Sequence, residues 1–154
     1  MYQATVPVFR HTLSRIADMV ALAGPDALDQ PFQDMTARQR FSIAAGLSIE
    51  ITCPLAGREL PDLPAALGPR LAVARALLGG MKPAEFDPDP GRMIRREIDN
   101  IPVALPAVEF LHLFGMPLFF FQTALGYAGL RAAGVALSET DFDGFARPPA
   151  RPPI

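Results

Sequence analysis

The stretch FLHLFGMPLFFFQTALGYAGL, residues 110–130, decides how the rest of the sequence is interpreted. It has no Asp, Glu, Lys or Arg over 21 residues, which is long enough to cross a bilayer. However, His112, Pro117 and Gln122 stand within it, and such residues are less favourable facing lipid than facing protein. A helix that is apolar on all sides is also typical of a bundle centre. We therefore expect the central helix of a soluble bundle and no membrane span, with a membrane-anchored protein as the alternative.

The N-terminal segment supplies a first partner for this helix. Apolar residues follow one another at steps of three and four, which places them on one helical face: Val6, Phe9, Leu13, Ile16 and Val20. His11 falls on the opposite, polar face. Gly24-Pro25 should end the helix, because a flexible residue is followed by one that cannot continue it.

A second helix is predicted over residues 37–55. Thr36 and Gln39 match the capping box, in which each side chain satisfies the backbone N–H of the other residue. The alternation of residues 47–52 also resembles a strand. We predict a helix, because the apolar stretch is long and begins at a cap.

A third helix should start with Asp62 as its N-cap and Pro64 in its first turn. Gly68-Pro69 should kink this helix, and Gly79-Gly80 should end it. Its inner face would carry three small or apolar residues: Leu71, Ala74 and Leu78.

Apolar residues alternate on both sides of Asp99-Asn100, which predicts a small β-hairpin before the last helix. Pro102 restricts its strand to a sheet edge. The fourth helix should run over residues 106–133 with a bend at Pro117, and Gly134 should end it. We assign residues 1–144 to one domain and residues 145–154, ARPPARPPI with the preceding Phe, to a Pro-rich disordered tail.

Composition excludes several functional classes. A formal net charge of −2 argues against nucleic-acid binding, which rewards a basic excess. The single cysteine, Cys53, cannot form an internal disulfide and fits a reducing cytoplasm. The N-terminal residues have no basic start followed by an apolar run, so we expect no signal peptide and a cytoplasmic protein. The chain has no P-loop, dinucleotide-binding or nucleophile-elbow motif.

Four polar residues within apolar surroundings are candidates for a ligand pocket: Glu50, His112, Gln122 and Tyr127. Glu50 has no cation three or four residues away on its own helix. If it is buried, it needs a partner from elsewhere or a raised pKa, and it would suit a general base or a ligand-binding carboxylate. The alternative is that Glu50 faces solvent or pairs with an arginine of another helix. His112 and Gln122 lie ten residues apart, so both could border one cavity, although a buried histidine hydrogen-bonded to a backbone carbonyl is more common.

Metal binding is not supported by the residue spacing. The chain has two histidines, which excludes a three-histidine site within one molecule. Glu50, Cys53 and His112 are possible ligands, but no H-x-x-x-H, E-x-x-H or C-x-x-C spacing joins them. We expect no metal and no other cofactor.

Both ends of the sequence carry a specific pattern: residues 1–9, MYQATVPVF, and residues 116–122, MPLFFFQ, with Tyr127, Gly134 and Asp141-Phe142 following. This pattern resembles a bacterial domain-of-unknown-function family, DUF1993, and the likeness covers nearly the whole chain up to about residue 144. That family is similar to the DinB-like (damage-inducible) superfamily. The resemblance implies an all-α, up-down-down-up four-helix bundle with a small β-hairpin before the last helix, often paired as a homodimer.

The resemblance also implies two functional hypotheses. Many members of the superfamily hold a divalent metal with three histidines, and Gln122 stands where the family usually has a histidine. We therefore expect a metal-free bundle that binds a small apolar ligand or acts as a dimeric structural module. The alternative is a thiol-dependent transferase or isomerase with a divalent metal, which requires Glu50 and His112 to face one cavity. Whether the protein is an enzyme is left open by the sequence.

Overall fold

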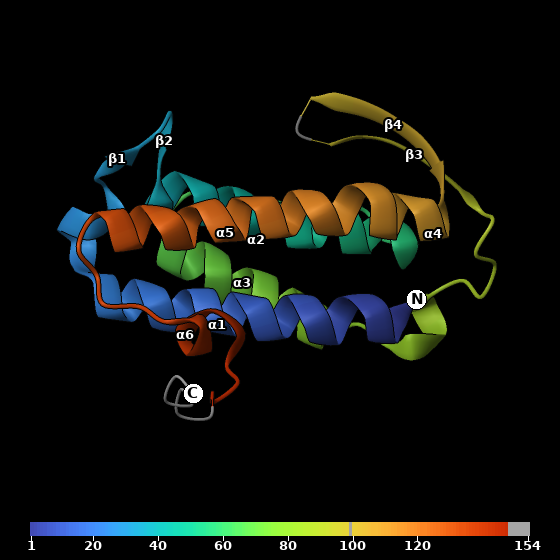
Figure 1. Cartoon of the computed structure of the whole chain (residues 1–154). Helices are drawn as coiled ribbons and strands as arrows, with labels where there is room; N and C mark the ends of the chain where they lie inside the picture. Colours follow the sequence, from blue (N-terminus) through green and yellow to red (C-terminus); the bar gives the residue numbers. More distant parts are fainter. Residues whose placement is uncertain (99, 148–154) are drawn as a thin grey trace, which may run out of the picture.

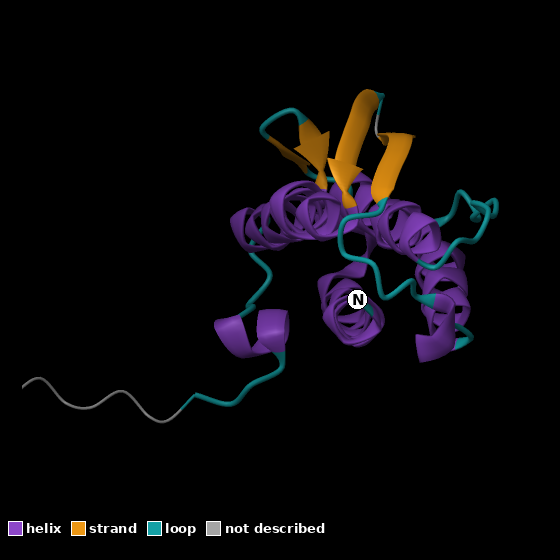
Figure 2. Cartoon of the chain, turned by 90° about the vertical axis from the view of Figure 1, so that its right-hand side faces the viewer, coloured by secondary structure: helices purple, strands orange, loops and turns teal. Residues whose placement is uncertain are grey.

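The structure is a computed structural model that describes residues 1–98 and 100–147 (Figure 1). Its long helices pack side by side, and Figure 2 views them nearly end-on. In chain order they are α1 (Tyr2–Leu28), α2 (Ala37–Leu55), α3 (Leu67–Gly79) and a continuous helical rod made of α4 (Ala107–Glu109), the π-helical segment η2 (Phe110–Gly115) and α5 (Met116–Ala132).

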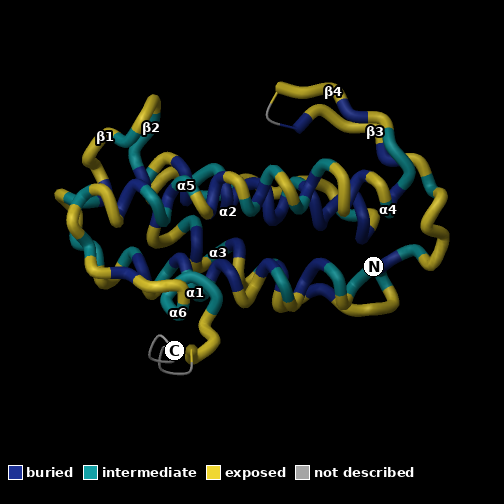
Figure 3. Tube along the Cα trace, viewed as in Figure 1, coloured by how far each residue is buried: buried dark blue, intermediate teal, exposed yellow. Residues whose placement is uncertain are grey.

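Helix α2, and not the helix of residues 110–130 as predicted, lies at the centre of the packing, against α5, α3 and α1. The predicted capping box is confirmed: the Gln39 N–H donates to Thr36 Oγ1 at 3.2 Å, and the Thr36 N–H donates to Gln39 Oε1 at 2.9 Å. From Ala44 to Ala56 every residue except Glu50 is buried (Figure 3). Burial on all sides explains why the sequence has no clear helical stripe here.

Helix α1 buries four of the five residues of the predicted stripe, since Val6, Phe9, Leu13 and Ile16 are each at most 1% exposed, and Val20 is partly buried. Gly24 interrupts the helix with φ 72° and ψ 168°, a conformation open to glycine. One further turn follows, from Pro25 to Leu28. The predicted break is therefore confirmed, although helical structure resumes after it.

Helix α3 begins later than predicted. Ala66, not Asp62, occupies the N-cap position, and Pro64 precedes the helix. Gly68 and Pro69 consequently fall in the first turn, where proline removes no intrahelical hydrogen bond and causes no kink. The predicted inner face of Leu71, Ala74 and Leu78 is buried.

The π-helical segment η2 precedes Pro117, which is the second residue of α5. Proline has no N–H to donate within a helix, and a wider turn is one way to accommodate this loss. Gly134, with φ 89°, reverses the chain after α5, and the Val135 N–H donates to Leu130 O at 3.0 Å. The helix from Ala107 to Ala132 is long and apolar enough to cross a membrane, and 33% of its 18-residue window is buried.

Two small antiparallel hairpins project from the same side of the bundle, away from α1 (Figures 1 and 2). The predicted hairpin is formed by β3 (Met93–Ile98) and β4 (Ile101–Pro106), with Ile94 opposite Leu105. Asn100 adopts φ 62° in its turn, and Asp99 lies outside the described residues. The other hairpin, β1 (Pro31–Phe32) with β2 (Met35–Thr36), was not predicted, because two-residue strands leave no alternation to detect.

A short helix, α6 (Glu139–Asp143), follows α5 and packs against α1. Helix α6 was not predicted. Beyond it, the Phe145 ring stacks on His11 at 5.9 Å between centroids, and Arg147 forms ion pairs with Glu139 and Asp143. Residues 148–154 lie outside the described residues, so the disordered tail stays a prediction.

Candidate functional site

Gln122 is 6% exposed and faces α2, where it meets a buried arginine. Arg40, 7% exposed, donates from Nη1 to Gln122 Oε1 at 3.0 Å and from Nη2 to Asp34 Oδ1 at 2.7 Å. The guanidinium also lies 6.0 Å from the centre of the Phe121 ring. Arg40 therefore links α2 to Gln122 of α5 and, through Asp34, to the turn of the β1–β2 hairpin.

Tyr127 lies on another side of α5, facing α6. Its ring meets Phe142 edge-on at 5.5 Å between centroids, and its hydroxyl accepts from Arg131 Nη1 at 3.5 Å. The two rings line a hollow of about 260 Å³ together with Ala124 and three charged residues: Glu139, Asp143 and Arg147.

A second hollow, of about 200 Å³, is also lined by Phe142 and Asp143. The other lining residues come from α1, α5 and the segment after α6: Val8, His11, Thr12, Phe120 and Phe145. The His11 ring holds α6 in place, since Nε2 lies 2.7 Å from the Asp143 carbonyl oxygen. The sequence placed His11 on an exposed face, which is correct, but carried no sign of this contact.

Glu50 is half-buried on α2 and lines a pocket of about 330 Å³. Arg70 of α3 lies beside it, so the cation that is absent from α2 itself is supplied by another helix. The remaining lining residues come from α2 and from the loop that follows it: Gly46, Ile49, Leu60, Pro61, Asp62 and Leu63.

His112 is exposed on η2, and its Nδ1 lies 3.1 Å from the Val108 carbonyl oxygen. The predicted contact with a backbone carbonyl is therefore present, but the histidine is exposed and not buried as expected. Gln122 is buried against Arg40 instead, so His112 and Gln122 do not share that environment. The pocket lined by Glu50 contains none of the other three candidates. The four residues thus belong to separate places in the molecule.

Cys53 is 2% exposed on α2. Burial raises the pKa of its thiol, and the positive charges of Arg58 and Arg96 oppose this rise. A buried thiol with a raised pKa has little thiolate character and is a poor nucleophile. Among residues 1–98 and 100–147, no three His, Cys, Asp or Glu side chains are grouped so that they could hold a metal ion.

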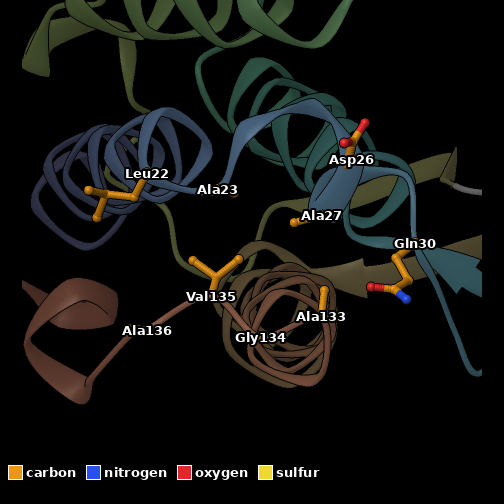
Figure 4. A pocket seen from close by; sticks show the side chains of 9 residues that line it. All are labelled: Leu22, Ala23, Asp26, Ala27, Gln30, Ala133, Gly134, Val135 and Ala136. Atoms are coloured by element: carbon orange, nitrogen blue, oxygen red, sulfur yellow. The ribbon is translucent and has the colours of Figure 1, made fainter.

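A cleft of about 690 Å³ opens between the end of α1 and the end of α5 (Figure 4). Figure 4 shows Leu22 and Val135 on one side of it and Gln30 on the other. None of the predicted site residues lines this cleft. Its only signals in the sequence are the two turn glycines, Gly24 and Gly134, which shape the ends of the two helices.

The fold is similar to that of a known protein. A crystal structure of a DinB family member from Shewanella denitrificans matches with a TM-score of 0.80, covering 99% of this chain and 95% of that chain. The two sequences are 19% identical, so the likeness concerns the fold alone. No functionally curated protein matches the sequence.

The family of the chain follows from a second comparison. The model of a domain of unknown function, DUF1993, matches residues 1–143, nearly the same range over which the resemblance was predicted. The chain therefore belongs to the DUF1993 family.

Proposed function

We propose that this protein is a cytoplasmic, metal-free bundle of up-down-down-up order that binds a small apolar ligand beneath α6, where this helix meets α1 and α5. One observation carries the proposal. Phe142 and Asp143 of α6 line both hollows, so a ligand in either of them would contact the same short helix.

The hollows have a suitable size and lining. Their volumes of about 260 and 200 Å³ exceed the roughly 150 Å³ of an engineered apolar cavity that binds benzene. Four aromatic side chains contribute to their walls: Phe120, Tyr127, Phe142 and Phe145. Such a lining favours one aromatic ring or a short hydrocarbon chain.

Binding can be measured by titrating the ¹⁵N-labelled protein with p-xylene and recording amide chemical shifts. We expect shifts around Tyr127 and Phe142. Ala124→Trp should fill one hollow and abolish the shifts near it, whereas Leu22→Trp, at a 63% exposed position, should leave them unchanged. Shifts that persist in Ala124→Trp, or that are absent from the unchanged protein, would refute this site.

Arg40 supports the metal-free part of the proposal. The Gln122 side-chain oxygen, a potential ligand, already accepts a hydrogen bond from the guanidinium. A metal ion placed beside Gln122 would face this fixed positive charge at short range in a buried environment, where charge repulsion is strong. Elemental mass spectrometry of the purified protein tests this point, and one transition-metal ion bound per chain would contradict it.

The alternative, a thiol-dependent transferase or isomerase with a divalent metal, has less support. It requires Glu50 and His112 to converge, but Glu50 lines a pocket beside Arg70 and His112 is exposed on η2. No observation on the described residues favours this activity over ligand binding.

The dimeric structural module, in contrast, is favoured by a specific surface. Leu113 is 70% exposed and Phe121 is 55% exposed, and Pro117 between them is also exposed. Positions four residues apart lie on one helical face, so these residues form an apolar strip. We propose that a second copy of the chain covers it.

Sedimentation equilibrium tests the dimer. The double variant Leu113→Glu/Phe121→Glu should be monomeric at concentrations where the unchanged protein is dimeric, because the charges would lose water on association. Leu22→Glu, on α1, is the matched control. An unchanged protein that is already monomeric would end this proposal.

A further inference from the structure

The pocket around Glu50 is separate from the hollows beneath α6 and has a different character. It contains two acidic side chains, Glu50 and Asp62, together with the guanidinium of Arg70. Apolar side chains complete the wall: Ile49, Leu60, Pro61 and Leu63. Charges of both signs thus meet an apolar surface in one pocket of about 330 Å³.

The local sequence explains how the pocket forms. Gly57, with φ 68°, ends α2 by turning the chain back, and the Arg58 N–H donates to Cys53 O at 2.9 Å. The returning loop places residues 60–63 beside Gly46 and Glu50. Leu63 packs against the hydrophobic core and so anchors this loop.

Arg70 is held in position by backbone groups on both sides of the pocket. Its Nε donates to Ser42 O of α2 at 2.9 Å, and its Nη1 donates to Pro64 O of the loop at 3.2 Å. These contacts use two of the five donors of a guanidinium. The charge is therefore fixed before any ligand arrives, which lowers the entropic cost of binding.

Gly46 brings the opposite charges together. A Cβ atom at this position would lie 2.7 Å from Arg70 Nη2 and 3.5 Å from Glu50 Oε1. The Arg70 guanidinium therefore lies against the bare backbone of α2, close to the Glu50 carboxylate. An α-amino acid carries its ammonium and carboxylate groups on one carbon atom, so it matches two opposite charges that lie this close together.

We propose that this pocket binds an α-amino acid with an aliphatic side chain. Arg70 receives the carboxylate, Glu50 and Asp62 receive the ammonium group, and Leu60 with Leu63 contacts the side chain. Charge-assisted hydrogen bonds of this kind are about twice as strong as neutral ones. An inorganic ion would leave the apolar wall of the pocket without a contact, whereas an aliphatic side chain would cover it.

Three probes of the same shape test the assignment by amide chemical shifts of the full chain. L-Leucine carries both charged groups, isopentylamine carries the ammonium alone, and 4-methylpentanoate carries the carboxylate alone. We expect leucine to shift signals around Gly46 and Leu63 and to bind on the order of 10-fold more tightly than either other probe. Equal binding of isopentylamine, or no shifts with leucine up to its solubility limit, would overturn the proposal.

Variants separate the two charges. Glu50→Gln should weaken the binding of leucine on the order of 10-fold. Glu59→Gln, at an exposed acid outside the pocket, should leave leucine binding unchanged. Gly46→Ala should displace Arg70 and so weaken the binding of leucine and of 4-methylpentanoate, while the binding of isopentylamine stays unchanged. Unchanged leucine binding in both Glu50→Gln and Gly46→Ala would place the ligand elsewhere. These results are independent of the p-xylene titration, which concerns the hollows beneath α6.

Discussion

The two sides of α5 differ in how they meet their neighbours. Toward α2 the contact is close: a Cβ atom on Gly126 would lie 2.4 Å from the Phe41 ring, and one on Gly115 would lie 2.9 Å from Ile51. On the side that faces α6 and α1 the contact is looser, because the two hollows beneath α6 lie there. The same helix thus provides a tightly packed seam and an open groove.

This difference suggests that the two sides of α5 have separate roles. A close-packed interface loses stability when one of its side chains becomes larger or smaller, because the neighbouring atoms have no room to move. A groove covered by a five-residue helix can admit a ligand by displacing that helix, with α2 and its contacts unchanged. Stability should therefore depend on the α2–α5 seam, and ligand binding on the groove side.

The largest effect is expected at the seam. Gly126→Ala should lower the free energy of unfolding by about 2–3 kcal/mol, because its methyl group would overlap the Phe41 ring. Chemical denaturation measures this change. Gly68→Ala, where nothing lies within 4 Å, is the matched control and should be neutral or stabilising by about 0.5–1 kcal/mol. Similar losses in both variants would mean that the seam is not tightly packed.

The polar contact in the same seam should have the next largest effect. Arg40→Met should cost about 1–2 kcal/mol, because it leaves the buried Gln122 amide without this donor. Adding Gln122→Met should recover part of the loss, since an apolar pair leaves no unsatisfied group. Denaturation of both single variants and the double variant gives the coupling energy, and strictly additive costs would contradict the contact.

A smaller effect is expected on the groove side. Phe142→Ala should reduce stability by about 1 kcal/mol, because this ring is only partly buried. It should also speed amide exchange in residues 138–147, which hydrogen-exchange mass spectrometry measures. Leu22→Ala, at a 63% exposed position of α1 outside both hollows, is the control. Faster exchange throughout α5 in Phe142→Ala would show that the two sides are not independent.

The smallest effect concerns a surface ion pair that belongs to neither side. Arg58 hydrogen-bonds the Glu85 carboxylate and holds its pKa below the ordinary value. This pair therefore contributes stability above that value and loses it as the pH falls through the lowered pKa. Glu85→Gln should lower the midpoint of thermal unfolding slightly at pH 7, and the difference from the unchanged protein should vanish in acid. A difference that grows in acid would have the wrong sign.

Local sequence signals determined the helices and the larger hairpin. The Thr36–Gln39 cap, the break at Gly24 and the reversal at Gly134 each depend on contacts or backbone angles within a few residues. The same holds for the β3–β4 turn at Asn100. Such features need no knowledge of the rest of the chain, because the atoms that cause them are neighbours in sequence.

Tertiary structure alone decided where α3 begins and which polar residues meet. Asp62 had the chemistry of an N-cap but became part of a pocket wall, because the loop that carries it packs along α2. Arg40 reached Gln122 across 82 positions, and Arg70 reached Glu50 from another helix. Periodicity shows which face of a helix is buried, but the partner of a buried polar group depends on how the helices are placed against one another.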